Sequence, residues 1–320
     1  MMMPTTSTLP EHFEPALCPL TDMGVIEVSG VDAEAFLNAQ LSRNVDSRRP
    51  SRATLAGWLD ARGRVLALFH TLRADDRWLL LTRGADVDAL IRRLSMFVLR
   101  ADVCLRNATA DRKAVAVVGN ANSLTASPFA GLRHRSGGSA AAGNGAHAIR
   151  IAPRLAWVLA PREGLRSLRN QIPRGSAEVA VAEEILLGLV NLAPHLAGRF
   201  TAHMLNLDRL GAVSFDKGCY PGQEVVARTQ NLGRVKRRAH LFGTRLRQAP
   251  AVGAALLDQE GDAVGEVVRA APVIDAGIKL LAVVRADAVA DDLFCATDTD
   301  APLRREALPW EQAAGGEFQS

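Results

Sequence analysis

The sequence has few cysteines and no long apolar run. Its four cysteines lie far apart and form no C-x-x-C pair: Cys18, Cys104, Cys219 and Cys295. This spacing argues against a disulfide scaffold, gives no sign of a sequence-local zinc site and suits a reducing cytosol. No apolar run approaches the roughly 18 residues needed to span a membrane. The first residues also lack the basic and apolar regions of a signal peptide. We therefore expect a soluble, cytoplasmic protein.

Aromatic residues are scarce and the charges are nearly balanced. Aromatics make up 5% of the chain, and 38 basic residues stand against 34 acidic ones, a net charge of +4. This mild excess permits an anionic ligand but does not by itself argue for nucleic acid. Hydrophobic residues at 48% and charged residues at 22% are typical of a soluble globular protein.

Apolar periodicity predicts strands and helices along most of the 320 residues. The predicted strands and hairpin are Met23–Gly30, Thr54–Arg73 with a turn at Gly63, Arg77–Arg83 and Lys113–Gly119. The predicted helices are Val31–Leu41, which Asp32 can cap, Asp86–Phe97 and Ala177–Asn191. No long βαβ crossover connects these elements, so we expect an α+β fold with antiparallel sheets.

The pattern changes near Arg237. Short apolar runs within Arg238–Asp287 are separated by turn residues, which predicts a small antiparallel barrel or sandwich after a domain boundary. The Gly, Ala and Ser-rich stretch Ser136–His147 is interpreted as a mobile surface loop. Residues 311–320 are interpreted as a disordered tail.

One stretch, FDKGCYPGQEVVART (Phe215–Thr229), carries a cysteine where a helix is expected to begin. Pro221 can occupy the first helical turn, and Gly233 or Asn231 can end the helix. Cys219 then lies at or just before the helix N-terminus, where the macrodipole and nearby Lys217 would lower the thiol pKa. Cys219 is therefore either a reactive thiolate or a small residue filling a crowded turn.

The neighbours of Cys219 allow two interpretations each. Gln223 and Glu224 fall in the first helical turn, where an acid can simply complement the dipole. Gly218 and Gly222 would let the backbone approach a ligand, or would only satisfy a tight bend. Upstream, Asn206 and Asp208 either orient a ring with an amide-like edge or form an Asx turn. The residues alone leave these alternatives open.

The segment SFDKGCYPGQEVVART, with NLDRLGAV before it and LGRVKRR after it, resembles the signature of the YgfZ family of folate-binding proteins. That family belongs to the GcvT superfamily, which also includes the T-protein aminomethyltransferases. Every fixed position of the pattern K-G-C-[FY]-x-G-Q-E is met, by Lys217, Gly218, Cys219, Tyr220, Gly222, Gln223 and Glu224. The strand and helix from Gly24 to Asp46 and the hairpin from Gly57 to Arg73 are also similar to the superfamily.

The resemblance implies a cloverleaf of two α+β parts and a C-terminal β-barrel around a central channel that binds tetrahydrofolate. It implies a folate-binding region of two interleaved subdomains at residues 14–236 and a barrel at 237–310. Family members support iron–sulfur enzymes, including one that thiolates tRNA, and act under oxidative stress, and the motif cysteine is required. The residues this assigns are Cys219 and Lys217 for chemistry, and Asn206, Asp208, Tyr220, Gly222, Gln223, Glu224 and Arg228 for folate binding.

The chain departs from the family pattern at several positions. Ala202 and His203 replace a usual Pro and Gln, and Glu184 stands where Arg is usual, which puts those family contacts in doubt. T-proteins carry an aspartate after the first hairpin, but no acid lies between Arg64 and Arg73. This argues against aminomethyl transfer, because that reaction needs a carboxylate near the folate nitrogen.

The same residues also allow other interpretations. A Cys–His hydrolase pairing Cys219 with His195 or His203 has no local signature, and a cluster held between chains through Cys219 stays open. The basic stretch Arg234–Arg247 is either a solvated strand face or a surface for RNA, an acidic partner or the folate glutamate tail.

The leading hypothesis is a cytoplasmic tetrahydrofolate-binding accessory protein for iron–sulfur enzymes or their assembly factors, with an indirect link to tRNA modification. It has no resident metal, no membrane contact and no stand-alone activity, and Cys219 faces the folate pocket. The alternatives are a tetrahydrofolate-dependent one-carbon transferase and a thiol-based redox or cluster-carrier module.

Overall fold

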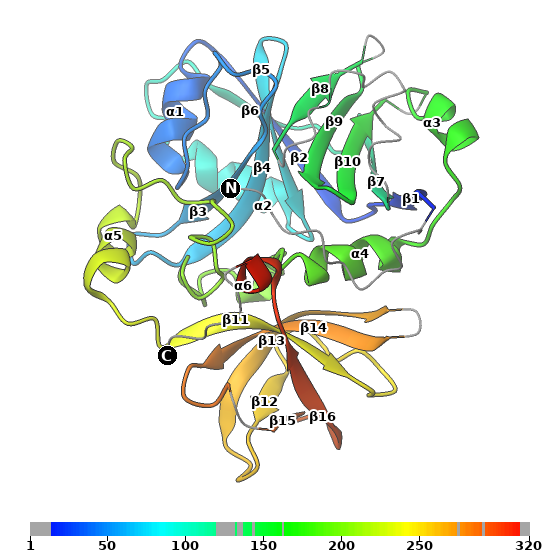
Figure 1. Cartoon of the computed structure of the whole chain (residues 1–320). Coiled ribbons are helices and arrows are strands. Elements are labelled where there is room, and N and C mark those ends of the chain that lie inside the picture. Colours follow the sequence, from blue (N-terminus) through cyan, green and yellow to red (C-terminus); the bar gives the residue numbers. More distant parts are fainter. Residues whose placement is uncertain are drawn as a thin grey trace.

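The computed structural model describes residues 14–119, 132, 137–142, 145–161, 163–273, 276–289 and 292–313. These residues form two five-stranded sheets side by side and a closed six-stranded barrel beneath them (Figure 1). Every pair of named strands is antiparallel. The predicted α+β class, its three-part arrangement and its C-terminal barrel are therefore confirmed.

The first sheet has the strand order β3-β4-β5-β2-β6 and packs one face against two helices. Its strands are β2 (Met23–Ser29), β3 (Thr54–Leu59), β4 (Val65–Ala74), β5 (Arg77–Arg83) and β6 (Cys104–Asn107). The helices are α1 (Ala33–Gln40) and α2 (Val87–Ser95). Asp32 precedes α1 but does not cap it, because its carboxylate accepts the Asp102 N–H instead.

The second sheet has the order β1-β7-β10-β9-β8. Its elements are β1 (Ala16–Pro19), β7 (Lys113–Val118), β8 (Ser139–Ala141), β9 (His147–Ala152), β10 (Leu155–Ala160) and the flanking helix α3 (Arg166–Gln171). The predicted loop Ser136–His147 contains strand β8, which pairs with β9, so that prediction is wrong for Ser139–Ala141; residues 136, 143 and 144 lie outside the described residues.

The two sheets share one core. Leu72, Leu79 and Leu81 of the first sheet pack in the same buried cluster as Ile149 and Trp157 of the second. The chain starts in the second sheet with β1, builds the first sheet from β2 to β6, and returns to the second with β7. The faces of β4, β5 and β10 that meet in this core are the walls of the site described below.

The barrel closes in the order β11-β14-β13-β12-β15-β16, with β11 also paired to β16. Its strands are β11 (Arg237–Thr244), β12 (Ala255–Leu257), β13 (Ala263–Val273), β14 (Gly277–Arg285), β15 (Leu293–Cys295) and β16 (Asp298–Glu306). Helix α6 (Pro309–Ala313) follows, within the stretch that was expected to be disordered from residue 311. Residues 314–320 lie outside the described residues.

Helix α4 (Ala177–Leu186) lies between the second sheet and the barrel, and a 3-10 turn (Pro194–Leu196) follows it (Figure 1). The predicted helix to Asn191 is too long, because the chain turns at Gly188 with φ 71°. The Gly188 N–H bonds the Ile185 carbonyl and the Leu189 N–H bonds the Glu184 carbonyl, the pattern of a Schellman ending. No helix among the described residues has the length and apolarity to cross a membrane.

Glu184 on α4 ties all three sheets together. Its fully buried carboxylate accepts from Arg83 on β5 at 2.5 Å, from the Trp157 indole on β10 at 3.1 Å, and from Arg269 on β13. The Asn191 amide donates a fourth bond at 3.3 Å. An ionised carboxylate offers about four lone-pair sites, so all of them are used.

We expect Arg269→Met to lower the free energy of unfolding by about 3–5 kcal/mol, because it leaves Glu184 buried with one guanidinium fewer. The matched control is Arg285→Met, which removes an exposed partner of Asp287 on the same barrel and should cost about 1 kcal/mol or less. Urea unfolding of both variants checks this prediction. Equal losses in the two variants would show that the buried cluster does not hold the parts together.

Candidate functional site

The motif loop before helix α5 (Gln223–Leu232) is fastened to helix α1 by Lys217. The Lys217 ammonium donates to the carbonyl oxygens of Asn38 at 2.8 Å and Leu41 at 2.5 Å, at the end of α1. It also lies 5.1 Å from the centre of the Tyr220 ring. Burial lowers the pKa of Lys217 to about 8. Because it binds the Asn38 and Leu41 carbonyls, the Lys217 ammonium lies at the C-terminal end of a helix, where cations are favoured.

Tyr220 and Gly222 hold the loop against the rest of the fold. Tyr220 is buried, its hydroxyl has no hydrogen-bond partner among the described residues, and burial raises its pKa to about 12. Gly222 has φ 79°, and a Cβ there would lie 2.5 Å from the Asp60 carbonyl oxygen in the β3–β4 turn. Gly222 is required for this close backbone approach within the fold.

Helix α5 begins two residues after Pro221, later than the sequence predicts. Gly222 is its N-cap and Gln223 its first residue, so Pro221 lies outside the helix, and the prediction that it occupies the first turn is wrong. The left-handed conformation of Gly222 causes this later start, because it sets the direction of the chain into α5. The predicted end at Gly233 is confirmed, since Gly233 is the C-cap.

Cys219 is exposed, three residues before the N-cap of α5. Its neighbour Gly218 faces open space, with nothing within 4 Å of an added Cβ. Gln223 donates to the Lys217 carbonyl at 3.2 Å, which supports the loop from within. Glu224 and Arg228 are exposed on the same helix. The loop thus presents the thiol to solvent while Lys217 and Tyr220 anchor it.

Asn206 and Asp208 bind the first strand of the barrel. Asn206 donates to the Ala239 carbonyl at 2.7 Å, and both side chains accept from the Arg238 guanidinium at 2.8–3.0 Å. Burial raises the pKa of Asp208, but the bonds and charge of Arg238 outweigh this and hold it below its usual value. Nearby, His203 is within 3.2 Å of the Gln230 amide oxygen, and Ala202 is fully buried. Asn206 and Asp208 therefore join this segment to the barrel, and His203 joins it to helix α5.

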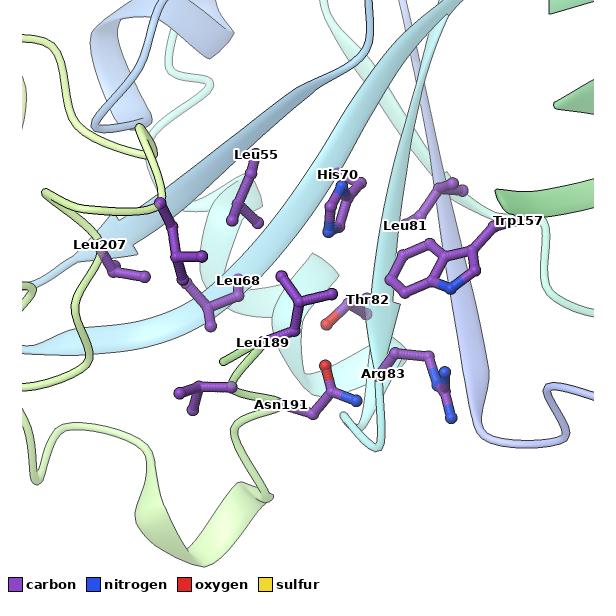
Figure 2. A pocket seen from close by; sticks show the side chains of 12 residues that line it. Leu55, Leu68, His70, Leu81, Thr82, Arg83, Trp157, Leu189, Asn191 and Leu207 are labelled. Carbon is purple, nitrogen blue, oxygen red and sulfur yellow. The ribbon is translucent and has the colours of Figure 1, made fainter. Parts of the chain in front are cut away.

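A cavity lies at the junction of the two upper sheets and the segment after α4 (Figure 2). The unfilled space among its lining residues, open solvent included, is about 360 Å³. Its apolar walls come from Leu55, Leu68, Leu81, Leu189, Val190, Leu207 and Leu210. Its polar or aromatic lining comes from His70, Thr82, Arg83, Trp157 and Asn191. Apolar walls with a few convergent polar groups are typical of small-molecule sites.

His70 on β4 packs edge-on against Trp157 on β10, with ring centres 4.6 Å apart. It faces the cavity but is surrounded by protein, and burial together with the Arg83 charge lowers its pKa to about 4. The imidazole is therefore neutral near pH ~7 and can either donate or accept. None of the residues lining the cavity is a carboxylate.

None of the nine residues expected in the site lines this cavity. Cys219 does not line this cavity, and its placement beside a folate stays a prediction. The sequence pattern did not indicate His70, Thr82 and Trp157 because each lies within a mostly apolar strand, and Asn191 lies in an irregular segment after α4. The available signal was a polar residue inside such a strand, as with His70 in LALFHTLR and Thr82 in LLLTR. The structure describes no group of three or more His, Cys, Asp or Glu side chains placed to hold a metal ion.

The chain is similar to known proteins in sequence and in fold. No family model matches the chain. The chain is 25% identical over 315 residues to the tRNA-modifying protein YgfZ of Colwellia psychrerythraea, covering 96% of each chain. It is 26% identical over 311 residues to that of Klebsiella pneumoniae, covering 92% of each. The glycine cleavage system aminomethyltransferase T of Bartonella henselae has the same fold, with a TM-score of 0.74, 18% identity and 96% and 91% coverage. The resemblance to YgfZ proteins and the GcvT-like fold are thus confirmed.

We expect Lys217→Met to destabilise the protein by about 1–3 kcal/mol, since two α1 carbonyls lose their donor. The exposed Lys236→Met is the matched control and should change stability by about 0.5 kcal/mol or less. Because the folded pKa of Lys217 is about 8 and the unfolded value is about 10.4, the unfolded chain binds more protons between these values. The difference in free energy of unfolding between the wild type and Lys217→Met should therefore widen from about pH 7 to about pH 9.5. Urea unfolding at both pH values measures it, and parallel pH profiles would contradict the buried position of the ammonium.

Proposed function

We propose that the chain binds a reduced folate in the central cavity and supports iron–sulfur enzymes, including enzymes that modify tRNA. The observation that carries this proposal is its similarity, over nearly the whole chain, to two curated tRNA-modifying proteins YgfZ. The proposal assigns folate binding to residues 14–236, with the barrel at 237–310 as the third part, and it places the protein in the cytoplasm.

The residues that line the cavity offer the types of contact that a folate needs. A reduced pterin is a flat bicyclic ring with an amide-like edge, and it needs apolar contact on its faces and hydrogen bonds at its edge. Trp157 and the leucines supply the apolar contact on the ring faces. His70, Thr82 and Asn191 supply the hydrogen bonds at the ring edge. When bound, tetrahydrofolate would supply a carrier for a one-carbon unit. The chain's own residues bind and orient the ring and exclude water from it.

A one-carbon transferase receives less support from the same cavity. General acid–base transfer at a folate nitrogen calls for a positioned side chain whose pKa suits the proton exchanged. The lining contains no carboxylate, and His70 faces the cavity from the hairpin strand on which T-proteins were expected to carry an acid. With a pKa of about 4, His70 binds a proton weakly. An accessory role therefore fits better than catalysis by this chain alone.

The exposed position of Cys219 supports a role in contact with a partner protein. A thiol that lies outside the cavity and is open to solvent can meet an oxidant, an iron–sulfur client or an assembly factor. This position favours the thiol-based alternative for Cys219 within the same protein, while the cavity serves the folate. In this proposal Lys217 and Tyr220 fix the loop, and Glu224 and Arg228 lie on the exposed side of the same helix.

Calorimetric titration of the whole chain with tetrahydrofolate tests the proposal, and we expect binding at micromolar ligand. Because Cys219 does not line the cavity, Cys219→Ser should bind with the same affinity within about twofold, or ~0.4 kcal/mol. Absence of binding by the wild type at high micromolar ligand would remove the folate from the proposal. A loss of affinity in Cys219→Ser would instead place the thiol at the ligand.

In cells lacking the protein, we expect Cys219→Ser to keep its fold but fail to restore the activity of a tRNA-modifying iron–sulfur enzyme. The matched control is Cys104→Ser, which removes another exposed thiol on strand β6 and should complement fully. The level of the modified nucleoside in bulk tRNA is the measurement. Full complementation by Cys219→Ser would show that the thiol has no chemical role.

A further inference from the structure

The Asn191 side chain lies between the buried cluster around Glu184 and the cavity. Its Nδ2 donates to Glu184 Oε2 at 3.3 Å. The carboxylate is held among cationic donors and can only accept, so the amide must turn its NH₂ toward Glu184 and its Oδ1 away. Figure 2 shows that oxygen directed among the lining residues and the nitrogen turned toward Arg83. The cavity therefore contains a hydrogen-bond acceptor of fixed orientation.

Arg83 lines the same cavity, but its charge is already compensated. Its Nε donates to Asp22 at 2.7 Å and its Nη1 to Glu184 at 2.5 Å. With Arg269 on the other oxygen of Glu184, two guanidiniums face two carboxylates, and the cluster has no net charge. An anion entering the cavity would meet no uncompensated positive charge and would lose its hydration.

The remaining polar groups of the lining are uncharged. His70 and Thr82 offer neutral donors and acceptors, and the other residues are apolar or aromatic. The cavity thus differs from an anion site, which would need free cationic or N–H donors. Its chemistry suits a planar, uncharged ring that carries an N–H group.

We infer that Asn191 determines the specificity of the cavity. Its Oδ1, held in position by Glu184, accepts an N–H of an uncharged heteroaromatic ring, and the cavity rejects carboxylate groups. Glu184 is a positioning residue, since it touches Asn191 and Arg83 and not the ligand. This inference rests on the proposed function and names the part of the folate that the cavity recognises.

The test compares three probes by calorimetry: tetrahydrofolate, 6-methyltetrahydropterin, which is the ring without carboxylates, and p-aminobenzoylglutamate, which is the anionic tail alone. Asn191→Leu should weaken binding of both ring-containing probes about tenfold or more, because a buried N–H then loses its acceptor. The tail fragment should bind far more weakly than the ring to either protein. Asn231→Leu, on the exposed surface of α5, is the matched control and should leave all three affinities unchanged.

The outcomes separate the inference from the proposed function. If the wild type binds neither ring-containing probe, the proposed function fails. If the wild type binds them and Asn191→Leu binds them equally well, the role of Asn191 is overturned and the proposed function stands. If the tail fragment binds as tightly as the ring, charge rejection is wrong. Should Asn191→Leu not fold by thermal melting, Asn191→Ser replaces it with the same expected loss, since serine cannot reach both Glu184 and the cavity.

The positioning role of Glu184 has its own measurement. Glu184→Gln gives the cluster an excess positive charge and a new NH₂ group, so Asn191 is no longer fixed. The ratio of ring affinity to tail affinity should fall about tenfold or more in this variant. A smaller folded fraction does not change this ratio, so an unchanged ratio would overturn the positioning role. The Asn191 variants test the remainder of the inference independently.

Discussion

The structure depends on one buried carboxylate. Glu184 is fully buried, and four donors from the two upper sheets, the barrel and the turn after α4 converge on it. Such a charge is costly to bury and is stable only if its partners stay in place. The cluster therefore fixes where β5, β10 and β13 meet, and the apolar cores on either side pack around that junction.

The cavity and the motif loop are separate features with separate supports. The cavity lies beside the Glu184 cluster, and its polar residues come from β4, β5, β10 and the turn after α4. The motif loop is held by α1 and by the β3–β4 turn, and its contacts keep Cys219 at the surface. This separation allows a folate to bind in one place and a thiol to meet a partner in another. In the proposed accessory role, the folate and the client need not compete for the same groups.

Much of the fold could be predicted from the sequence, because strand alternation and turn residues are local signals. The hairpin with Gly63, helix α2, the end of α5 at Gly233 and the barrel after residue 236 all follow from such patterns. Two predictions about helix ends were wrong. Gly188 ends α4 earlier than predicted, and Asp32 binds the Asp102 backbone instead of capping α1. The cavity could not be predicted, because His70, Thr82, Trp157 and Asn191 are distant in sequence and meet only when the two sheets pack. The motif indicated the resemblance to YgfZ proteins, and in this structure Lys217 and Gly222 hold its loop against α1 and the β3–β4 turn.

The central claim is that a reduced folate binds between β4, β5, β10 and the turn after α4. A crystal structure of the chain grown with tetrahydrofolate tests it most directly. The expected result is density for the bicyclic ring among His70, Thr82, Trp157 and Asn191, with Glu184 still bonded to Arg83, Arg269 and Asn191. Density for the ring at the motif loop beside Cys219, with this cavity holding only solvent, would contradict it.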